Sequence, residues 1–281
     1  MMLVGLYPLI LVILSLSADF SIPQKGEIGL TRNEEMRMEL LSPKITLREK
    51  DNPTWYGTGT ITAIRFENRV IDGDVRKCWV TNILTAKHII ADSKVREGEI
   101  TVTMPIFLLS RRIGFRTIPA EVVRISDKYD MAMLALVTHS KPLSEEPAIF
   151  LTGAVSENCV IHLCGSSKGV QGTIADGVYI AGSYQFPMHG SPNSAPVVTT
   201  LLTSCITDQG ASGAAFFTVA NSNRFAVGML THVISQGVPG SFGLTSTEIR
   251  EFAVTEGLEY AFRFSSESTA TSRPTKIATT E

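Results

Sequence analysis

Short apolar runs rich in Val, Ile and Thr, separated by Gly, Asn and Asp, fill most of this chain between residues 55 and 262. They lie at 57–66, 77–86, 99–109, 120–125, 131–137, 158–165, 172–182, 196–205, 214–219, 224–234 and 242–249. Many short strand-like runs at near-regular spacing, with almost no helical periodicity, are typical of β-barrels and β-sandwiches. The pattern stops at a polar link, residues 140–149, and then returns. The sequence therefore predicts an all-β fold in two units, residues 55–139 and 150–262.

The N-terminal region differs from this pattern. Residues 1–18 are apolar and uncharged, a stretch that is short for a membrane span and suits a signal peptide. Ser15-Leu16-Ser17 supplies the small-x-small pattern for cleavage near Ala18, so we expect a secreted or periplasmic protein. Because no basic residue precedes the apolar stretch, an uncleaved membrane anchor with the domain outside the cytoplasm is the alternative.

Residues outside the two β-rich units are expected to be accessory. Residues 19–54 are mixed and charged, and they predict an N-terminal extension with a short helix at Asn33–Leu41. Residues 263–281 are rich in Ser and Thr with almost no large apolar side chains, which predicts a flexible tail.

Composition argues against several classes of function. The chain has 25 Lys and Arg against 27 Asp and Glu, a formal net charge of −2, without a basic cluster, so no nucleic-acid partner is expected. No phosphate-binding glycine loop, dinucleotide fingerprint, HExxH spacing or CxxC pair occurs, so we expect neither a cofactor nor a metal. A membrane contact is expected only if the N-terminal segment stays uncleaved. In an exported chain Cys78, Cys159, Cys164 and Cys205 are able to form up to two disulfides, and they are equally consistent with buried free thiols.

Ser212 lies in a run of small residues, Gly210 to Gly213, directly before the apolar run at 214–219. Glycine on either side lets the backbone turn sharply and lets a carbonyl group approach main-chain N–H groups. An exposed hydroxyl beside two amide donors is what a nucleophilic serine needs. On its own this stretch is equally consistent with a plain loop between strands.

A histidine and an aspartate occupy matching places earlier in the chain. His88 follows the apolar run at 77–86, and Asp130 precedes the apolar run at 131–137. Taken singly, each has an ordinary structural explanation, as a buried core histidine or a turn-forming aspartate. The order His, Asp, Ser, with separations of 42 and 82 residues inside a double β pattern, predicts a catalytic triad.

These motifs resemble those of the chymotrypsin-like (trypsin-fold) serine peptidases, and most closely the HtrA-like bacterial forms. Residues 83–90, ILTAKHII, are similar to the histidine motif LTxxHV, and residues 129–136, YDMAMLAL, to the aspartate motif TDIALL. Residues 210–217, GASGAAFF, are similar to the nucleophile motif GxSGGP, and Gly57–Thr60 to the Gly-x-Gly opening strand. The resemblance covers Tyr56–Phe252. It implies two six-stranded Greek-key β-barrels with the active site in the cleft between them.

The resemblance also implies a role for each matching residue. Ser212 attacks the scissile carbonyl, His88 transfers the proton, and Asp130 orients the imidazole. The main-chain N–H groups of Gly210 and Ser212 form the oxyanion hole. The Thr231 hydroxyl supports the aspartate, and its backbone pairs with an extended substrate. The implied activity is that of a serine-type endopeptidase acting on proteins or peptides.

The chain departs from the family pattern at several points, which include Ala214-Ala215 in place of Gly-Pro after the nucleophile and the absence of the digestive enzymes' cysteine frame. Ala211 replaces the usual Asp or Asn before the nucleophile, so activation through an ion pair with a newly cut N-terminus is not expected. Residues 253–281 are too few for a peptide-binding PDZ domain, so a stand-alone protease domain is expected. A catalytically inactive relative that serves as a binding or scaffold protein is the alternative, for which Ala211 leaves room.

The resemblance places five residues around the substrate: Ile206, Thr207, Gln209, Thr231 and His232. Ile206 stands where trypsin-type enzymes carry the acid that binds Arg or Lys, and Asp208 is expected at the rim. A buried apolar floor does not compensate the desolvation of a cation, so small or medium apolar side chains are the expected substrates. Thr207 and His232 are similar to the pair with which glutamyl endopeptidases read an acidic side chain. Because His232 lies two residues past the matching position, preference for Glu is the alternative.

Overall fold

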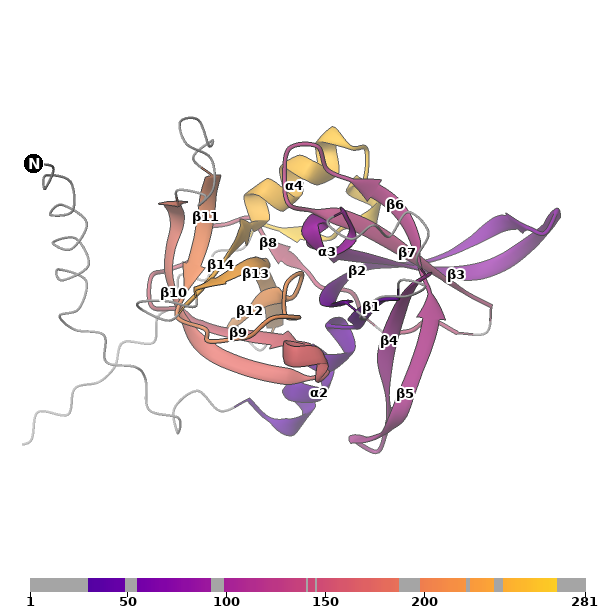
Figure 1. Cartoon of the computed structure of the whole chain (residues 1–281), viewed down its shortest axis with the longest axis horizontal. Coiled ribbons are helices and arrows are strands. Elements are labelled where there is room, and N and C mark those ends of the chain that lie inside the picture. The colour runs from indigo at the N-terminus through magenta and orange to yellow at the C-terminus, as the bar shows by residue number, and fades with distance from the viewer. Residues whose placement is uncertain are drawn as a thin grey trace, which may run out of the picture.

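The computed structural model of the chain describes residues 30–48, 55–91, 99–139, 141–144, 146–186, 198–220, 223–234 and 240–266 (Figure 1). The expected signal peptide and most of the expected tail lie outside these residues. Within them, no helix is long and apolar enough to cross a membrane.

Seven antiparallel strands form the first sheet, in the order β5-β4-β1-β2-β3-β7-β6. Their bounds are β1 Lys44–Arg48, β2 Trp55–Ile71, β3 Asp74–Thr85, β4 Glu99–Leu108, β5 Arg111–Pro119, β6 Glu121–Ile125 and β7 Ala132–Thr138. The edge strands β5 and β6 are joined by Ala120 alone, so the sheet must curl to bring its two edges to the same place. β2 and β3 extend past the sheet as a long hairpin (Figure 1), and the turn residues Asp72 and Gly73 have φ of 53° and 85°. Positive φ at both positions is the requirement of a type I′ hairpin turn, which Asp-Gly meets.

The strand β1 differs from the expected organisation. It falls in the segment 19–54, which was expected to precede the barrels, yet it pairs with β2 on one side and β4 on the other. Its alternate residues Ile45 and Leu47 are completely buried. The first sheet therefore has seven strands instead of six, because a segment upstream of the recognised pattern completes it.

The helix α2, Arg32–Leu41, matches the short helix expected from the sequence. It begins with a capping box, in which the Thr31 side chain and the Glu34 side chain each bond the other's main-chain N–H. Its buried side chains Met38 and Leu41 pack into the main core.

The second sheet contains a closed six-stranded barrel. The strand order is β12-β9-β10-β11-β14-β13-β8-β15, and an additional pairing of β12 with β13 closes the ring. The bounds are β8 Phe150–Leu151, β9 Val160–Gly165, β10 Thr173–Phe186, β11 Val198–Thr203, β12 Ala215–Ala220, β13 Asn223–Ile234, β14 Gly240–Thr245 and β15 Phe264–Ser265. The two-residue strands β8 and β15 are parallel additions outside the ring.

Helices are few and short in the rest of the described chain. They are α3 Lys87–Ala91, η2 Ser167–Gly169, α4 Ser246–Thr255 and η3 Glu259–Ala261. α4 begins with a second capping box, Thr245 with Glu248.

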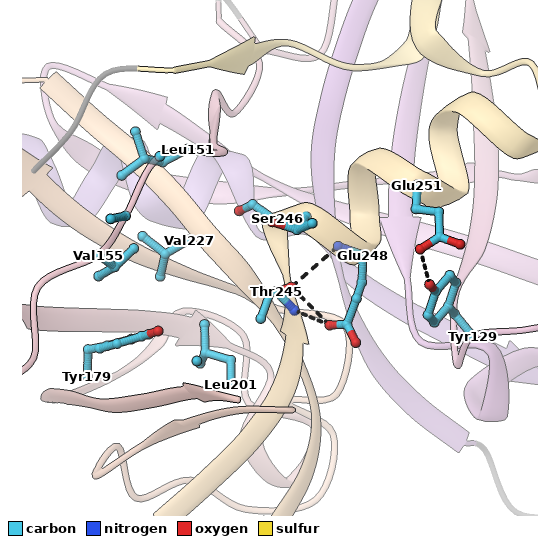
Figure 2. A pocket seen from close by; sticks show the side chains of 14 residues that line it. Tyr129, Leu151, Val155, Tyr179, Leu201, Val227, Thr245, Ser246, Glu248 and Glu251 are labelled. Carbon is cyan, nitrogen blue, oxygen red and sulfur yellow. Dashed lines mark hydrogen bonds between the residues drawn. The ribbon is translucent and has the colours of Figure 1, made fainter. Parts of the chain in front are cut away.

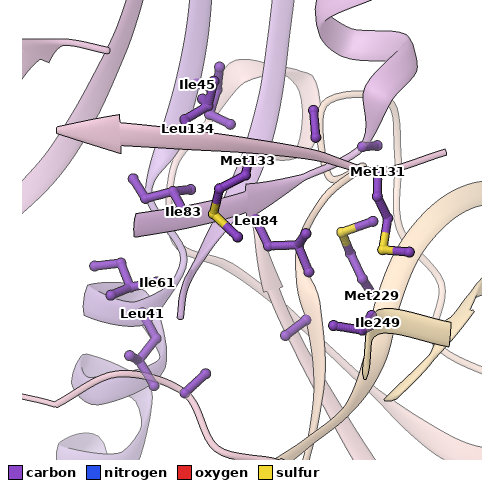
Figure 3. Packing of buried hydrophobic residues seen from close by; sticks show 14 of the residues in the cluster. Leu41, Ile45, Ile61, Ile83, Leu84, Met131, Met133, Leu134, Met229 and Ile249 are labelled. Atoms are coloured by element: carbon purple, nitrogen blue, oxygen red, sulfur yellow. The ribbon is translucent and has the colours of Figure 1, made fainter. Parts of the chain in front are cut away.

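The main hydrophobic cluster joins the two sheets. Figure 3 shows Ile61, Ile83 and Leu84 of the first sheet in one cluster with Met229 of β13 and Ile249 of α4, with Leu84 nearest to Met229. A smaller cluster, including Leu163, Leu201 and Phe216, fills the second barrel. A shared core of this kind fixes the two barrels against each other, so side chains contributed by both hold a defined geometry. All four cysteines are free thiols, so no disulfide contributes.

Candidate active site

His88 and Asp130 are joined by two hydrogen bonds. His88 Nδ1 lies 2.7 Å from Asp130 Oδ2, and the His88 main-chain N–H donates to Asp130 Oδ1 at 2.8 Å. His88 is in the first turn of α3, immediately after β3, and Asp130 ends the turn before β7. The turn is held by Ser126, whose hydroxyl accepts the main-chain N–H groups of Lys128 and Tyr129. The ring orientation of His88 is thus set by a carboxylate that is itself on a fixed turn.

The charge state of Asp130 follows from this contact. Burial raises the pKa of the Asp130 carboxyl, but the hydrogen bonds and positive charge of His88 outweigh burial, and the net pKa lies below its ordinary value. Asp130 is therefore ionised at neutral pH, the state in which it accepts the Nδ1–H proton of His88.

Ser212 is held against the first sheet by main-chain contacts. Its carbonyl accepts the N–H of Thr58 at 2.8 Å. The next residue, Gly213, has φ of 89°, and a Cβ there would lie 2.0 Å from the Thr58 carbonyl oxygen and 2.5 Å from Thr85 Oγ1. Only glycine fits this approach. Thr85 is three residues before His88, so the same contact brings the serine loop next to the histidine.

The hydroxyl of Ser212 donates to the Thr231 carbonyl oxygen at 3.3 Å. Thr231 is a buried residue of β13, at an irregularity in its pairing with β14. Its hydroxyl lies 3.0 Å from His232 Nδ1, and in the described residues it makes no hydrogen bond to Asp130. The expected support of Asp130 by the Thr231 hydroxyl is therefore wrong. The His232 ring instead lies beside that of His88, with 5.8 Å between the ring centroids.

The N–H groups of Gly210 and Ser212 are oriented by the carbonyl groups of the same peptides, each of which accepts a hydrogen bond. The Gln209 carbonyl accepts Lys168 N–H at 2.6 Å, and the Ala211 carbonyl accepts Ala214 N–H at 3.0 Å. None of the described peptide bonds is cis, and in a trans peptide the C=O and N–H groups point in opposite directions. Across the described part of the chain, neither N–H donates a hydrogen bond to the protein. Two free amide donors, one on the serine itself and one two residues before it, are able to stabilise a developing oxyanion.

The residues expected around the substrate are only partly where the sequence suggested. Ile206 is 64% exposed, so the expectation that it forms a buried apolar floor is wrong. The Thr207 hydroxyl lies 2.8 Å from the Ser167 hydroxyl, and Asp208 forms a surface ion pair with Lys168, 3.2 Å between Oδ2 and Nζ. Thr207 and His232 thus have different partners, and the described contacts do not join them into one acid-reading pair.

A separate hollow of about 470 Å³ lies between α4 and the second barrel (Figure 2). None of the candidate site residues lines it. Tyr129, which does, donates its hydroxyl to Glu251 of α4, and so fastens the turn that carries Asp130 to the C-terminal helix. The hollow is therefore not part of the candidate site, but the Tyr129–Glu251 hydrogen bond at its edge helps to hold the Asp130 turn in place.

Several contacts at the site are not indicated by the sequence motifs, although Thr58 itself lies in the opening-strand motif Gly57–Thr60. Thr58 Oγ1 donates to the Gly210 carbonyl at 2.8 Å and accepts the Ser166 N–H at 2.9 Å. Lys168 contributes its main-chain N–H. These hydroxyl and amide groups reach the site only because the fold brings distant residues together, so neither composition nor motif spacing predicts their contacts.

The two antiparallel β-barrels, with His88 and Asp130 from the first and Ser212 from the second, define a chymotrypsin-like, two-barrel fold. No protein-family model matches the chain. No curated protein matches it either.

Solved structures of serine proteases do match. The active form of the Rv3671c protease from M. tuberculosis is 17% identical, with a TM-score of 0.56 over 83% of this chain and 85% of that chain. The serine endoprotease from Yersinia pestis is 18% identical, with a TM-score of 0.55 over 83% and 68%. An HtrA-type protease solved with a tripeptide is 16% identical, with a TM-score of 0.54 over 83% and 65%. At these identities the likeness establishes the fold, and the chain has the trypsin-like fold of the HtrA-type proteases.

Proposed function

We propose that this chain is a serine endopeptidase that hydrolyses peptide bonds through an acyl-enzyme. The observation that carries the proposal is the His88–Asp130 pair, with its 2.7 Å bond to Nδ1, beside a serine on a loop with two free amide donors. The trypsin-like fold supports it, as does the tripeptide bound by an HtrA-type protease of the same fold.

In each half-reaction His88 acts first as a base and then as an acid. The Ser212 hydroxyl rotates away from the Thr231 carbonyl, its proton passes to His88, and its oxygen bonds to the scissile carbonyl carbon. The oxyanion is held by the N–H groups of Gly210 and Ser212. His88 gives the proton to the departing amine as the C–N bond breaks. Water then loses a proton to His88, attacks the acyl ester and releases the acid, and the proton returns to Ser212.

A fluorophosphonate probe tests this directly, because it phosphonylates only an activated serine. The expected result is covalent labelling of the wild-type chain, with the label mapped to the peptide containing Ser212. Labelling is lost in Ser212→Ala and strongly reduced in His88→Ala. Casein hydrolysis is lost in both, and the double variant is little worse than either, because the two residues act as a unit.

Absence of labelling in a folded wild-type chain would contradict the proposal and favour the inactive binding or scaffold protein. Labelling at a different serine would contradict only the assignment of Ser212 as the nucleophile and would leave the proposed serine-hydrolase chemistry standing.

For specificity, we propose small or medium apolar side chains on the acyl side of the cleaved bond. Asp208, the one carboxylate among residues 203–212, is paired with Lys168 at the surface. No carboxylate of that segment is therefore left to bind Arg or Lys. A peptide-library cleavage profile tests this. Dominant cleavage after Arg or Lys would contradict it, and dominant cleavage after Glu that is lost in His232→Ala would establish the acidic alternative.

We also propose that the protein is exported, on the strength of the apolar, uncharged residues 1–18 followed by Asp19. N-terminal sequencing of the mature protein is expected to begin near Ala18 or Asp19. Mature material that begins at Met1 and sediments with membranes would favour the uncleaved anchor.

A further inference from the structure

Thr58 connects three segments of the site that are distant in sequence. This residue of β2 is fully buried. Its hydroxyl donates to the Gly210 carbonyl at 2.8 Å and accepts the Ser166 N–H at 2.9 Å. A threonine hydroxyl has one proton to donate and lone pairs to accept, so the two bonds use complementary capacities. Its main-chain N–H also donates to the Ser212 carbonyl at 2.8 Å.

These contacts lie on both sides of the Gly210 N–H. The Gly210 carbonyl belongs to the peptide after Gly210, and the Gln209 carbonyl belongs to the peptide before it. The Gln209 carbonyl is held by Lys168 N–H at 2.6 Å, two residues along from Ser166. The Thr58 hydroxyl therefore holds one peptide directly and, through Ser166, anchors the loop that holds the other.

The packing leaves little freedom for compensation. A Cβ on Gly210 would lie 2.5 Å from the Ser166 carbonyl oxygen, so the serine loop and the η2 loop are in direct contact. Without the hydroxyl, the Gly210 carbonyl and the Ser166 N–H lose their partners inside the protein. Such groups turn toward other donors, acceptors or water, because an unpaired buried polar group is unfavourable. Any such rotation at Gly210 also re-aims its N–H.

We propose that the Thr58 hydroxyl is a positioning group for the oxyanion hole, acting on the Gly210 N–H through these two peptides. The proposal rests on the proposed peptidase function. It predicts that the hydroxyl stabilises the transition state and contributes little to binding the ground-state substrate, since the oxyanion forms only during attack.

Three variants of the full chain test this: Thr58→Val, which removes the hydroxyl at nearly constant volume, Thr58→Ser, which retains it, and Thr60→Val. Thr60 is the matched control. It is buried in the same strand, and its hydroxyl donates at 3.1 Å to Gly213 of the same loop, on the far side of Ser212. A peptide chosen from the cleavage profile gives kcat and KM, fluorophosphonate labelling gives the acylation-like rate, and thermal melting gives stability.

In Thr58→Val, kcat and the labelling rate are expected to fall roughly tenfold to a hundredfold, below the loss for deleting a whole oxyanion donor, with KM nearly unchanged. Thr58→Ser is expected to recover most of the activity, and Thr60→Val to retain it.

Near-wild-type kcat in Thr58→Val, an equal loss in Thr60→Val, or a loss expressed mainly in KM would overturn the positioning role while leaving the peptidase proposal intact. Thr58→Ala serves if the valine variant does not fold. If both fail to fold while Thr60→Val folds, the hydroxyl acts on stability and the proposal is wrong. An inactive, unlabelled wild-type chain would overturn the peptidase function, and this inference with it.

Discussion

Asp130 accepts two hydrogen bonds from His88, one from the ring Nδ1 at 2.7 Å and one from the main-chain N–H at 2.8 Å. The second bond fixes the carboxylate relative to the backbone, and the first then fixes the ring relative to the carboxylate. The tautomer of His88 with a proton on Nδ1 is favoured, which leaves Nε2 as the base.

Asp130→Asn is expected to lower kcat by roughly 10³–10⁴, because an amide donor at this position stabilises the wrong tautomer of His88. Asp127→Asn is the matched control. Asp127 lies three residues away in the same turn and is exposed. The activity of Asp127→Asn is expected to stay close to that of the wild-type chain in a casein or peptide assay. The reverse ranking of the two variants would show that the aspartate motif is misplaced.

Gly210→Ala is expected to reduce fluorophosphonate labelling by about two to three orders of magnitude, the scale of losing one oxyanion donor. Gly210 has φ of 94°, and the new Cβ would lie 2.5 Å from the Ser166 carbonyl oxygen. Gly210→Ala combines an unfavourable positive φ with a steric clash at the site. Gly73→Ala tests the positive φ alone, because Gly73 has φ of 85° but no atom within 4 Å of its Cβ position. Gly73→Ala is expected to cost only about 1 kcal/mol in unfolding free energy, with unchanged labelling. Equal labelling of both variants would contradict the prediction.

The sequence predicted the architecture well where the pattern was local and repeated. The expected helix Asn33–Leu41 is α2, and the apolar run at 131–137 is β7, buried along nearly its whole length. β1 could not be predicted. Its five residues alternate only twice, and what makes it a strand is pairing with β2 and β4, which is non-local.

The candidate site shows the same division. The linear motifs brought His88 and Asp130 to notice, and the structure places them in contact. Thr58 lies in the opening-strand motif Gly57–Thr60, but its hydroxyl bonds a carbonyl 152 residues away, so the motif does not indicate this contact. Counting back from Ser212 gave the position of Ile206 along the chain, but exposure depends on the surrounding fold, and the side chain is 64% exposed.

Arg112→Met is expected to lower the unfolding free energy by roughly 1–3 kcal/mol, because it leaves the Glu39 carboxylate without its cation. Arg112 Nη1 lies 2.6 Å from Glu39 Oε1, and the Glu39 side chain is 9% exposed against 40% for Arg112. The exposure of Arg112 places the effect below that of a fully buried pair. Arg111→Met is the control, because the Arg111 side chain is exposed and makes no hydrogen bond or ion pair within the described residues. Urea denaturation compares the two, and equal losses would contradict a role for the Glu39 contact.

His232 is expected to make the protein less stable as the pH falls below about 6.5, the ordinary pKa of a histidine side chain. Partial burial lowers the pKa of His232, the charge of Asp130 opposes this, and His88 adds to it, with a net pKa below the ordinary value, although part of the residue stays exposed. On acidification the unfolded chain therefore takes up this proton first. The contribution of His232 is fully present above pH 6.5 and is lost as the pH falls through the folded-state pKa.

Urea midpoints at pH 7.5 and pH 5 measure this, and His232→Asn is expected to lose less stability between them than the wild-type chain. His139→Asn, at an exposed histidine just after β7, controls for the removal of a histidine in general. Because His232 touches Thr231 and lies beside His88, a loss of stability at both pH values is compatible with the prediction. A pH dependence in His232→Asn as steep as that of the wild-type chain is not.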